Sequence, residues 1–132
     1  MPTEEVKIEK IIDVDWMDAE VKIPFYLNIK IHREAKEQEK PISIYRARIK
    51  AEVQAERFPG CAGIDVYYLG RNGEYIYAGY IRTGESDEWD VTDDFAGFGV
   101  NMAKLHIMLL SPNCIPDRYR IKLRFYVTYG VE

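Results

Sequence analysis

Hydrophobic and polar residues alternate with a period of two along most of the chain. The alternation is strict in residues 21–31, 45–55 and 119–129, where every odd-numbered position is apolar or aromatic. Successive side chains of a β-strand point to opposite faces, so each segment predicts a strand with one buried and one solvent-facing side. Because no segment keeps a 3.6-residue period over three turns, the sequence predicts an all-β, antiparallel protein.

A hairpin is predicted in residues 63–82 by the dipeptide Asn72–Gly73. These two residues can occupy the two positive-φ positions of a type I′ turn. Such a turn fixes a register in which three cross-strand pairs share one face, and we assign that face to the core. The pairs are Tyr68 with Tyr77, Val66 with Gly79 and Ile64 with Ile81.

Two further strands are predicted at residues 5–14 and 103–110. The segments together make seven or eight strands in one domain that spans residues 1–132. A β-sandwich of the jelly-roll type closes such a set of strands. Pro24 lacks a backbone N–H donor, so it predicts an edge position or a bulge for its strand. Residues 1–16 are predicted as a peripheral strand or as one exchanged with a neighbouring copy.

Three strings in the C-terminal half follow one another in a recognisable order: "WDVTDDF" (89–95), "KLHIMLL" (104–110) and "FYVTYG" (125–130). In this order they resemble galactose-binding-like jelly rolls, a group that includes non-catalytic carbohydrate-binding modules and the DNRLRE-type sandwiches of surface proteins. The resemblance implies a jelly-roll sandwich, and it implies a glycan as a candidate ligand. The first 40 residues carry no part of this pattern.

The composition is that of a soluble globular protein, with 47% hydrophobic and 30% charged residues. The net charge of −4 provides no overall attraction to nucleic acid, so nucleic acid is not predicted as a partner. The sequence shows neither a signal peptide nor an apolar run long enough for a membrane helix, so no membrane partner is predicted. Frequent Lys, Glu, Arg, Ile and Tyr suit a thermophilic source. The charged segment 33–40 is predicted as a solvated loop.

Cys61 and Cys114 lie in similar contexts, "FPGCAG" and "SPNCIP". Their Pro, Gly and Asn neighbours predict loops rather than strands. If both loops lie at one end of the fold, the two cysteines can form a disulfide. The alternative is two free thiols, because a single pair of cysteines fixes neither state.

The stretch "EWDVTDDFAGFG", residues 88–99, is the least strand-like part of the chain. One interpretation is a structural calcium site, since calcium takes carboxylate and carbonyl oxygens. The candidate ligands are Asp87, Asp90, Asp93 and Asp94. The alternative is turn chemistry, in which Asp90 caps a strand end and Thr92 or Asp93 caps one helical turn. Phe95 and Phe98 would then close the end of the sandwich. No other cofactor is predicted.

Cations gather at outward positions of two predicted strands. This set, the basic stripe, consists of Arg46, Arg48, Lys50, Arg118, Arg120, Lys122 and Arg124. If the two strands share a sheet, the stripe opposes edge-to-edge aggregation and favours solubility. The alternative is that the stripe on one copy meets the acidic residues 85–94 of another copy and orients an assembly.

Six aromatic residues fall in loops or at outward positions: Trp16, Tyr26, Tyr67, Tyr80, Trp89 and Tyr126. Exposed Trp and Tyr can stack on sugar rings or anchor a protein interface, so these six are the glycan or interface candidates. The alternative is that a second layer or a neighbouring subunit covers them. His32 and His106 also fall at outward positions, but two ligands do not make a zinc site.

No catalytic residue is predicted, because the sequence lacks a Gly-x-Ser-x-Gly motif, a phosphate loop and a dinucleotide fingerprint. We predict a non-catalytic structural subunit that assembles with copies of itself on a larger particle, or decorates one, such as a virion or a surface filament. A virion or cell-surface location is favoured over the cytoplasm. A carbohydrate-binding module is the first alternative. A hydrolase with two carboxylates across a cleft is the second.

Overall fold

The computed structural model describes residues 4–27, 42–97 and 99–131. This part of the chain forms eight strands: β1 (Glu4–Asp15), β2 (Glu20–Leu27), β3 (Ile42–Ala55), β4 (Ala62–Leu69), β5 (Tyr75–Arg82), β6 (Ser86–Asp90), β7 (Gly99–Leu109) and β8 (Arg118–Val131). None of it forms a helix long and apolar enough to cross a membrane. The predicted loop at 33–40 and His32 lie outside the described residues.

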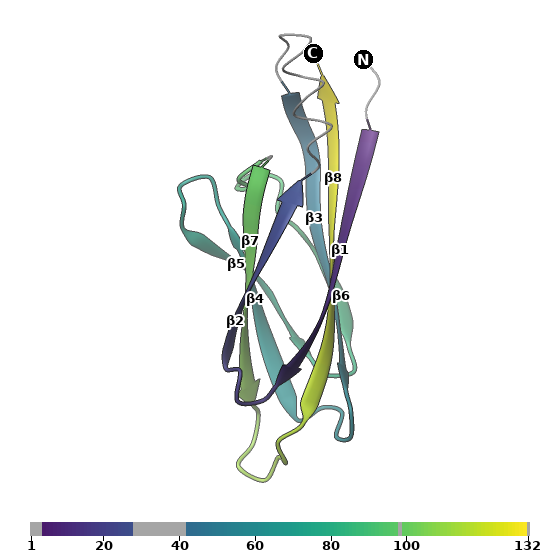
Figure 1. Cartoon of the computed structure of the whole chain (residues 1–132), viewed down its shortest axis with the longest axis vertical. Helices are drawn as coiled ribbons and strands as arrows, with labels where there is room; N and C mark the ends of the chain where they lie inside the picture. Colours follow the sequence, from purple (N-terminus) through teal and green to yellow (C-terminus); the bar gives the residue numbers. More distant parts are fainter. Residues whose placement is uncertain (1–3, 28–41, 98, 132) are drawn as a thin grey trace.

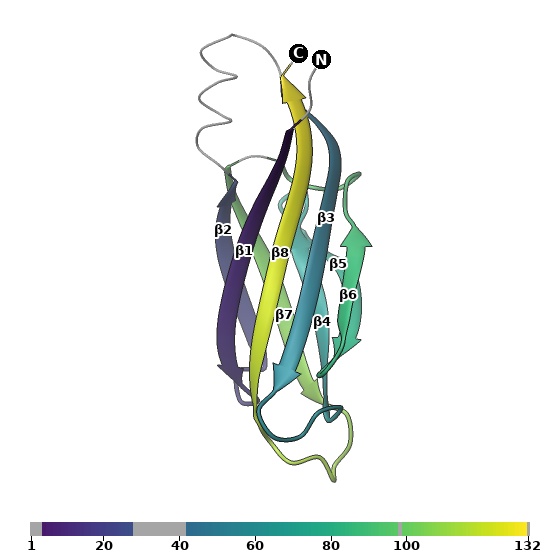
Figure 2. The same ribbon diagram turned by 90° about the vertical axis from the view of Figure 1, so that its right-hand side faces the viewer.

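The strands form two antiparallel sheets that pack face to face (Figure 1). The first sheet has the order β1-β8-β3-β6 and the second has the order β2-β7-β4-β5. Figure 2 looks onto the first sheet, with the second sheet behind it. Every connection except β4–β5 crosses from one sheet to the other. An eight-stranded double sheet with this order is a jelly roll, and the predicted all-β sandwich is therefore confirmed.

The core lies between the two sheets and follows the predicted alternation. The odd-numbered side chains of β8 from 119 to 129 are all buried, as the alternation predicts. Phe25 on β2 and Phe125 on β8 stack across the interior with ring centroids 3.8 Å apart. Because these rings belong to different sheets, their contact joins the two layers across the core.

The β4–β5 hairpin differs from the predicted two-residue turn. Gly70 N–H donates to the Glu74 carbonyl and Gly73 N–H donates to the Gly70 carbonyl, so three residues make the loop. Gly73 has φ of 77°, as the last position of such a loop requires. Tyr68 therefore pairs with Ile76, and the predicted Tyr68–Tyr77 pair is wrong.

A bulge in β5 compensates for the longer loop. The register shifts at Val66/Tyr67, where β5 carries Ala78 as an extra residue. Beyond the bulge, Val66 pairs with Gly79 and Ile64 pairs with Ile81, as predicted. Because of the bulge, the β5 residues between it and the turn, 75–77, face the side opposite to the one that the alternation predicts. Tyr77 is consequently 52% exposed on the outer face, and its predicted place in the core is wrong.

A second bulge lies near the start of β3, between Ile44 and Arg46. Tyr45 is 47% exposed there, although the alternation predicts a buried position. Its ring packs against Gly130 on β8, where a Cβ would lie only 2.9 Å from a ring carbon. An extra residue thus moves one aromatic ring from the core to the surface of the first sheet.

Two edge strands agree with the residues that the sequence places there. β2 is the outer strand of the second sheet, which suits Pro24 because no neighbour needs its missing N–H. β1 is the outer strand of the first sheet and pairs along its whole length with β8 of the same chain. The N-terminal strand thus completes its own sheet.

Candidate functional site

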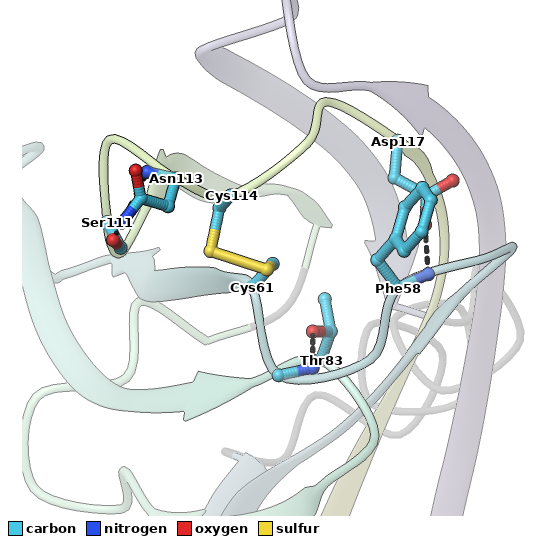
Figure 3. The surroundings of a disulfide bond; sticks show 8 residues. Phe58, Cys61, Thr83, Ser111, Asn113, Cys114 and Asp117 are labelled. Atoms are coloured by element: carbon cyan, nitrogen blue, oxygen red, sulfur yellow. Dashed lines mark hydrogen bonds between the residues drawn. A yellow bond between two sulfur atoms is a disulfide. The ribbon is translucent and has the colours of Figure 1, made fainter.

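One end of the sandwich is tied by a disulfide between two loops (Figure 3). Cys61 lies just before β4, and Cys114 lies in the connection from β7 to β8. Their Cα atoms are 5.4 Å apart and their sulfurs are bonded. Of the two predicted alternatives for the cysteines, the structure contains the disulfide.

The same end is held by the buried carboxylate of Asp117. Its Oδ2 accepts hydrogen bonds from the N–H groups of Arg57 and Phe58, both at 2.8 Å, and its Oδ1 accepts one from Arg118 N–H at 2.7 Å. Burial opposes ionisation, but these three donors outweigh it and hold the pKa of Asp117 below its ordinary value of 3.8. Asp117 therefore anchors the β3–β4 loop as an anion.

Replacing Asp117 with Asn is expected to reduce the acid sensitivity of the fold. Because the folded-state pKa of Asp117 is depressed, its stabilising contribution is present at neutral pH and is lost as the pH falls through that pKa. Asp117→Asn should lower the free energy of unfolding by about 1–3 kcal/mol at neutral pH. In urea unfolding curves, the difference from the wild type should narrow as the pH falls below the ordinary value of 3.8. If the difference in the free energy of unfolding does not change with pH, the Asp117 carboxylate does not make this pH-dependent contribution.

The stretch 88–99 closes the opposite end of the sandwich. β6 ends at Asp90, whose Oδ1 accepts the N–H of Thr92 at 2.9 Å, so the predicted cap by Asp90 is confirmed. The Thr92 hydroxyl then accepts the N–H of Ala47 at 2.9 Å and continues the edge of the sheet. Phe95 is 2% exposed and fills this end as predicted. The predicted helical turn is replaced by non-helical turns, and Phe98 lies outside the described residues.

The predicted calcium ligands do not converge. In the described ranges, no three His, Cys, Asp or Glu side chains form a group that could hold a metal ion. Asp87 and Asp90 are an odd number of residues apart on β6, so they point to opposite faces of the strand. The carboxylates of Asp87 and Asp90 accept the N–H groups of Glu88 and Thr92. The geometry thus favours turn chemistry over a calcium site formed by Asp87, Asp90, Asp93 and Asp94.

The basic stripe is assembled on the outer face of the first sheet, because β3 and β8 are neighbours there. Acidic residues of β1, β3 and β6 flank it in register. The ion pairs are Arg124–Glu9 at 2.7 Å, Arg120–Asp13 at 2.9 Å, Arg48–Glu88 at 2.5 Å, Arg48–Glu5 at 3.3 Å, Arg46–Asp90 at 3.9 Å, Arg118–Asp15 at 4.0 Å and Lys122–Glu52 at 4.0 Å. The hydrogen bond from Arg124 lowers the pKa of Glu9, as the one from Arg120 does for Asp13.

These contacts change the interpretation of the stripe. Glu88 and Asp90, which the sequence offers to another copy, pair instead with Arg48 and Arg46 of their own chain. Exposed ion pairs contribute little stability individually, but together they neutralise the charge of this face. The charge of the first sheet is therefore largely balanced within one molecule.

Two of the six predicted aromatic candidates, Trp89 and Tyr126, pack against other side chains of the chain, and a third, Trp16, remains exposed. Trp89 packs against the core, and its indole fills the space where Gly79 has no side chain. The ring of Tyr126 is covered by the Arg48 guanidinium, 4.8 Å from its centroid. Trp16 is 40% exposed at the disulfide end, where it lines a cavity of about 350 Å3 beside Asp117.

The other three candidates, Tyr26, Tyr67 and Tyr80, all face outward on the second sheet. Tyr67 and Tyr80 lie in adjacent rows of β4 and β5, whereas Tyr26 lies near the end of β2, beside Val100 of β7. The sequence reasoning missed Tyr75 and Tyr77, which lie on the same face. A signal was present in "EYIYAGY", where the spacing of tyrosines changes from two residues to three. That change is what a bulge leaves in an alternating pattern.

No protein-family model matches the sequence, and no curated protein matches it. The fold is similar to solved structures of viruses. One is a chain of the Kashmir bee virus empty particle at acidic pH, with a TM-score of 0.54 and 10% identity over 98% of this chain and 92% of that chain. A second is from Israel acute paralysis virus, with a TM-score of 0.53 and 10% identity over 93% of this chain and 72% of that chain.

A third similar chain is from the infectious bursal disease virus Gx strain, with a TM-score of 0.52 and 11% identity. It matches 96% of this chain but only 32% of that chain. The likeness at such identities is one of fold. The strings that resemble galactose-binding-like proteins lie at the end of β6 and in the turn after it, in β7 and in β8. The similar solved structures are virus chains, so they bear out the jelly-roll fold and do not confirm the galactose-binding-like family.

Proposed function

We propose that the protein is a non-catalytic structural subunit that assembles with copies of itself on a larger particle, or decorates one, such as a virion or a surface filament. The observation that carries this proposal is the complete jelly-roll strand order, β1-β8-β3-β6 over β2-β7-β4-β5. Nearly the whole chain, 98%, aligns with most of a chain from an empty virus particle.

The surface chemistry supports a structural role. The polar groups of the first sheet are engaged in ion pairs between neighbouring strands, and the buried Asp117 serves backbone N–H groups. In the described ranges, the acidic, histidine and cysteine side chains form no metal-binding group. The disulfide and the hydrogen bonds of Asp117 hold the loops at one end of the sandwich together. A fixed shape suits a building block that must fit a repeated lattice.

The expected result for the purified chain is a mass that rises with concentration above the 15.4 kDa of one copy. Size-exclusion chromatography with light scattering measures this, and electron microscopy of the largest species shows whether closed or linear particles form. Runs at low and high salt serve as an internal control, since charge-based contacts weaken with ionic strength while apolar contacts do not. A strict monomer at the highest soluble concentration contradicts self-assembly.

A further inference from the structure

The outer face of the second sheet differs chemically from the charge-balanced face of the first. Its outward side chains line up in rows across β2, β7, β4 and β5. One row consists of Lys22, Lys104, Tyr67 and Tyr77, each paired in register with the next. The adjacent row consists of Glu20, His106, Asp65 and Tyr80. We call these two rows, with Tyr75 beside them, the tyrosine–lysine face.

The lysines of this face form an unneutralised pair. Lys22 and Lys104 lie directly opposite each other on neighbouring strands, a placement that costs stability because like charges repel. In the part of the chain that the structure describes, neither forms an ion pair with a carboxylate. Their ammonium groups instead lie over aromatic rings. Lys104 Nζ is 4.7 Å from the Tyr67 centroid and 4.6 Å from that of Tyr75, while Lys22 Nζ is 5.7 Å from Tyr75.

The neighbouring row supplies hydrogen-bond acceptors. Asp65 is only partly exposed and lies 3.9 Å from His106 Nδ1. Glu20 stands at the edge, and Tyr80 is 37% exposed with its hydroxyl near Gly63. Rows on one face of a strand are about 6.8 Å apart, twice the rise per residue, which is the scale of one pyranose ring. The lysine row and the acidic row are thus adjacent rows of one face.

We propose that the tyrosine–lysine face binds a carboxylated sugar. The sugar carboxylate lies between the Lys22 and Lys104 ammonium groups, where two charge-assisted hydrogen bonds offset their repulsion. The C–H face of the ring packs on Tyr77, which is 52% exposed and whose ring stands at 64° to that of Tyr67, since aromatic faces carry partial negative charge. The sugar hydroxyls donate to Asp65 and reach the hydroxyl of Tyr80.

The acidic row favours a ligand with a single anionic group over a polyanion. Asp65 and Glu20 lie one row from the lysines, so a nucleic acid or a run of acidic residues would bring repeated negative charges against them. A ligand with one carboxylate and several hydroxyls satisfies both rows. This inference does not depend on self-assembly, because all the residues belong to one sheet of one chain.

Backbone NMR titration of the full chain with defined sugars tests the proposal. Sialyllactose and methyl glucuronide are the carboxylated probes, and they distinguish a sialic acid from a uronic acid. Lactose and the methyl ester of sialyllactose are matched neutral probes. Oligothymidylate and polyglutamate are the polyanion probes. We expect the amides of Lys104 and Tyr67 to shift with at least one carboxylated sugar and to stay unchanged with the neutral probes.

Three variants locate the site. Lys104→Met and Tyr77→Ser are expected to weaken binding of the carboxylated probe about tenfold, or about 1.4 kcal/mol. Lys50→Met removes the same charge from the outer face of the first sheet and should bind as the wild type does. The proposal is overturned if neither carboxylated sugar binds, if the methyl ester binds equally well, if a polyanion binds more tightly, or if Lys50→Met weakens binding as much as Lys104→Met.

Discussion

Removal of the Cys61–Cys114 disulfide is expected to destabilise the fold by about 4 kcal/mol. The bond joins residues 53 positions apart, so it closes a loop that contains β4, β5, β6 and β7. Cross-linking a loop of this length removes much conformational entropy from the unfolded chain, which raises the free energy of unfolding. In a chain of this size the melting temperature should fall by about 10–15 °C.

A double variant, Cys61→Ala with Cys114→Ala, measures this effect by calorimetry without leaving reactive thiols. Reducing the wild type should lower its melting temperature by a similar amount, whereas the double variant should not respond to the reductant. Equal melting temperatures for oxidised and reduced wild type would show that Asp117 and its three N–H donors already hold the two loops without the disulfide.

The sequence predicts the sandwich well wherever the alternation runs without interruption. Residues 119–129 form the middle of β8 with every odd side chain inside, since a strand paired on both sides cannot change its facing. Tyr45 and Tyr77 are misassigned for the opposite reason. Each lies beside a bulge, and one extra residue moves a side chain to the other face without changing the local composition.

The candidate sites depend on strand order, which alternation does not report. Outward positions on β3 and β8 place the basic stripe on one surface once these strands are neighbours. Four of the acids that neutralise it come from β1. Three of these pair with β8, more than 100 residues away in the chain, as Asp13 does with Arg120. The Lys22–Lys104 pair likewise exists only because β2 joins β7. Such contacts are non-local, so only the assembled topology reveals them.

Trp89→Ala is expected to lower the free energy of unfolding by about 3 kcal/mol, although the sequence offers Trp89 as an exposed aromatic. β6 and β5 are the edge strands of opposite sheets, and the indole of Trp89 crosses between them to lie on Gly79. Gly79 is buried, and a Cβ there would collide with the indole. Truncating the ring opens this edge of the sandwich to water. Urea unfolding monitored by far-ultraviolet circular dichroism measures the loss.

Gly79→Ala alone should cost about 1–3 kcal/mol, because the indole must move away from the new methyl group. In the Trp89→Ala background the same substitution should instead stabilise the fold by about 0.5 kcal/mol, since Ala is favoured over Gly in a strand. The backbone permits Ala there, as Gly79 is not among the positive-φ glycines. The effect of Gly79→Ala on the free energy of unfolding is thus expected to change sign when the indole is absent. Direct contact between the two residues requires this result in a double-mutant cycle. Additive effects would mean that Trp89 stabilises the edge without resting on Gly79.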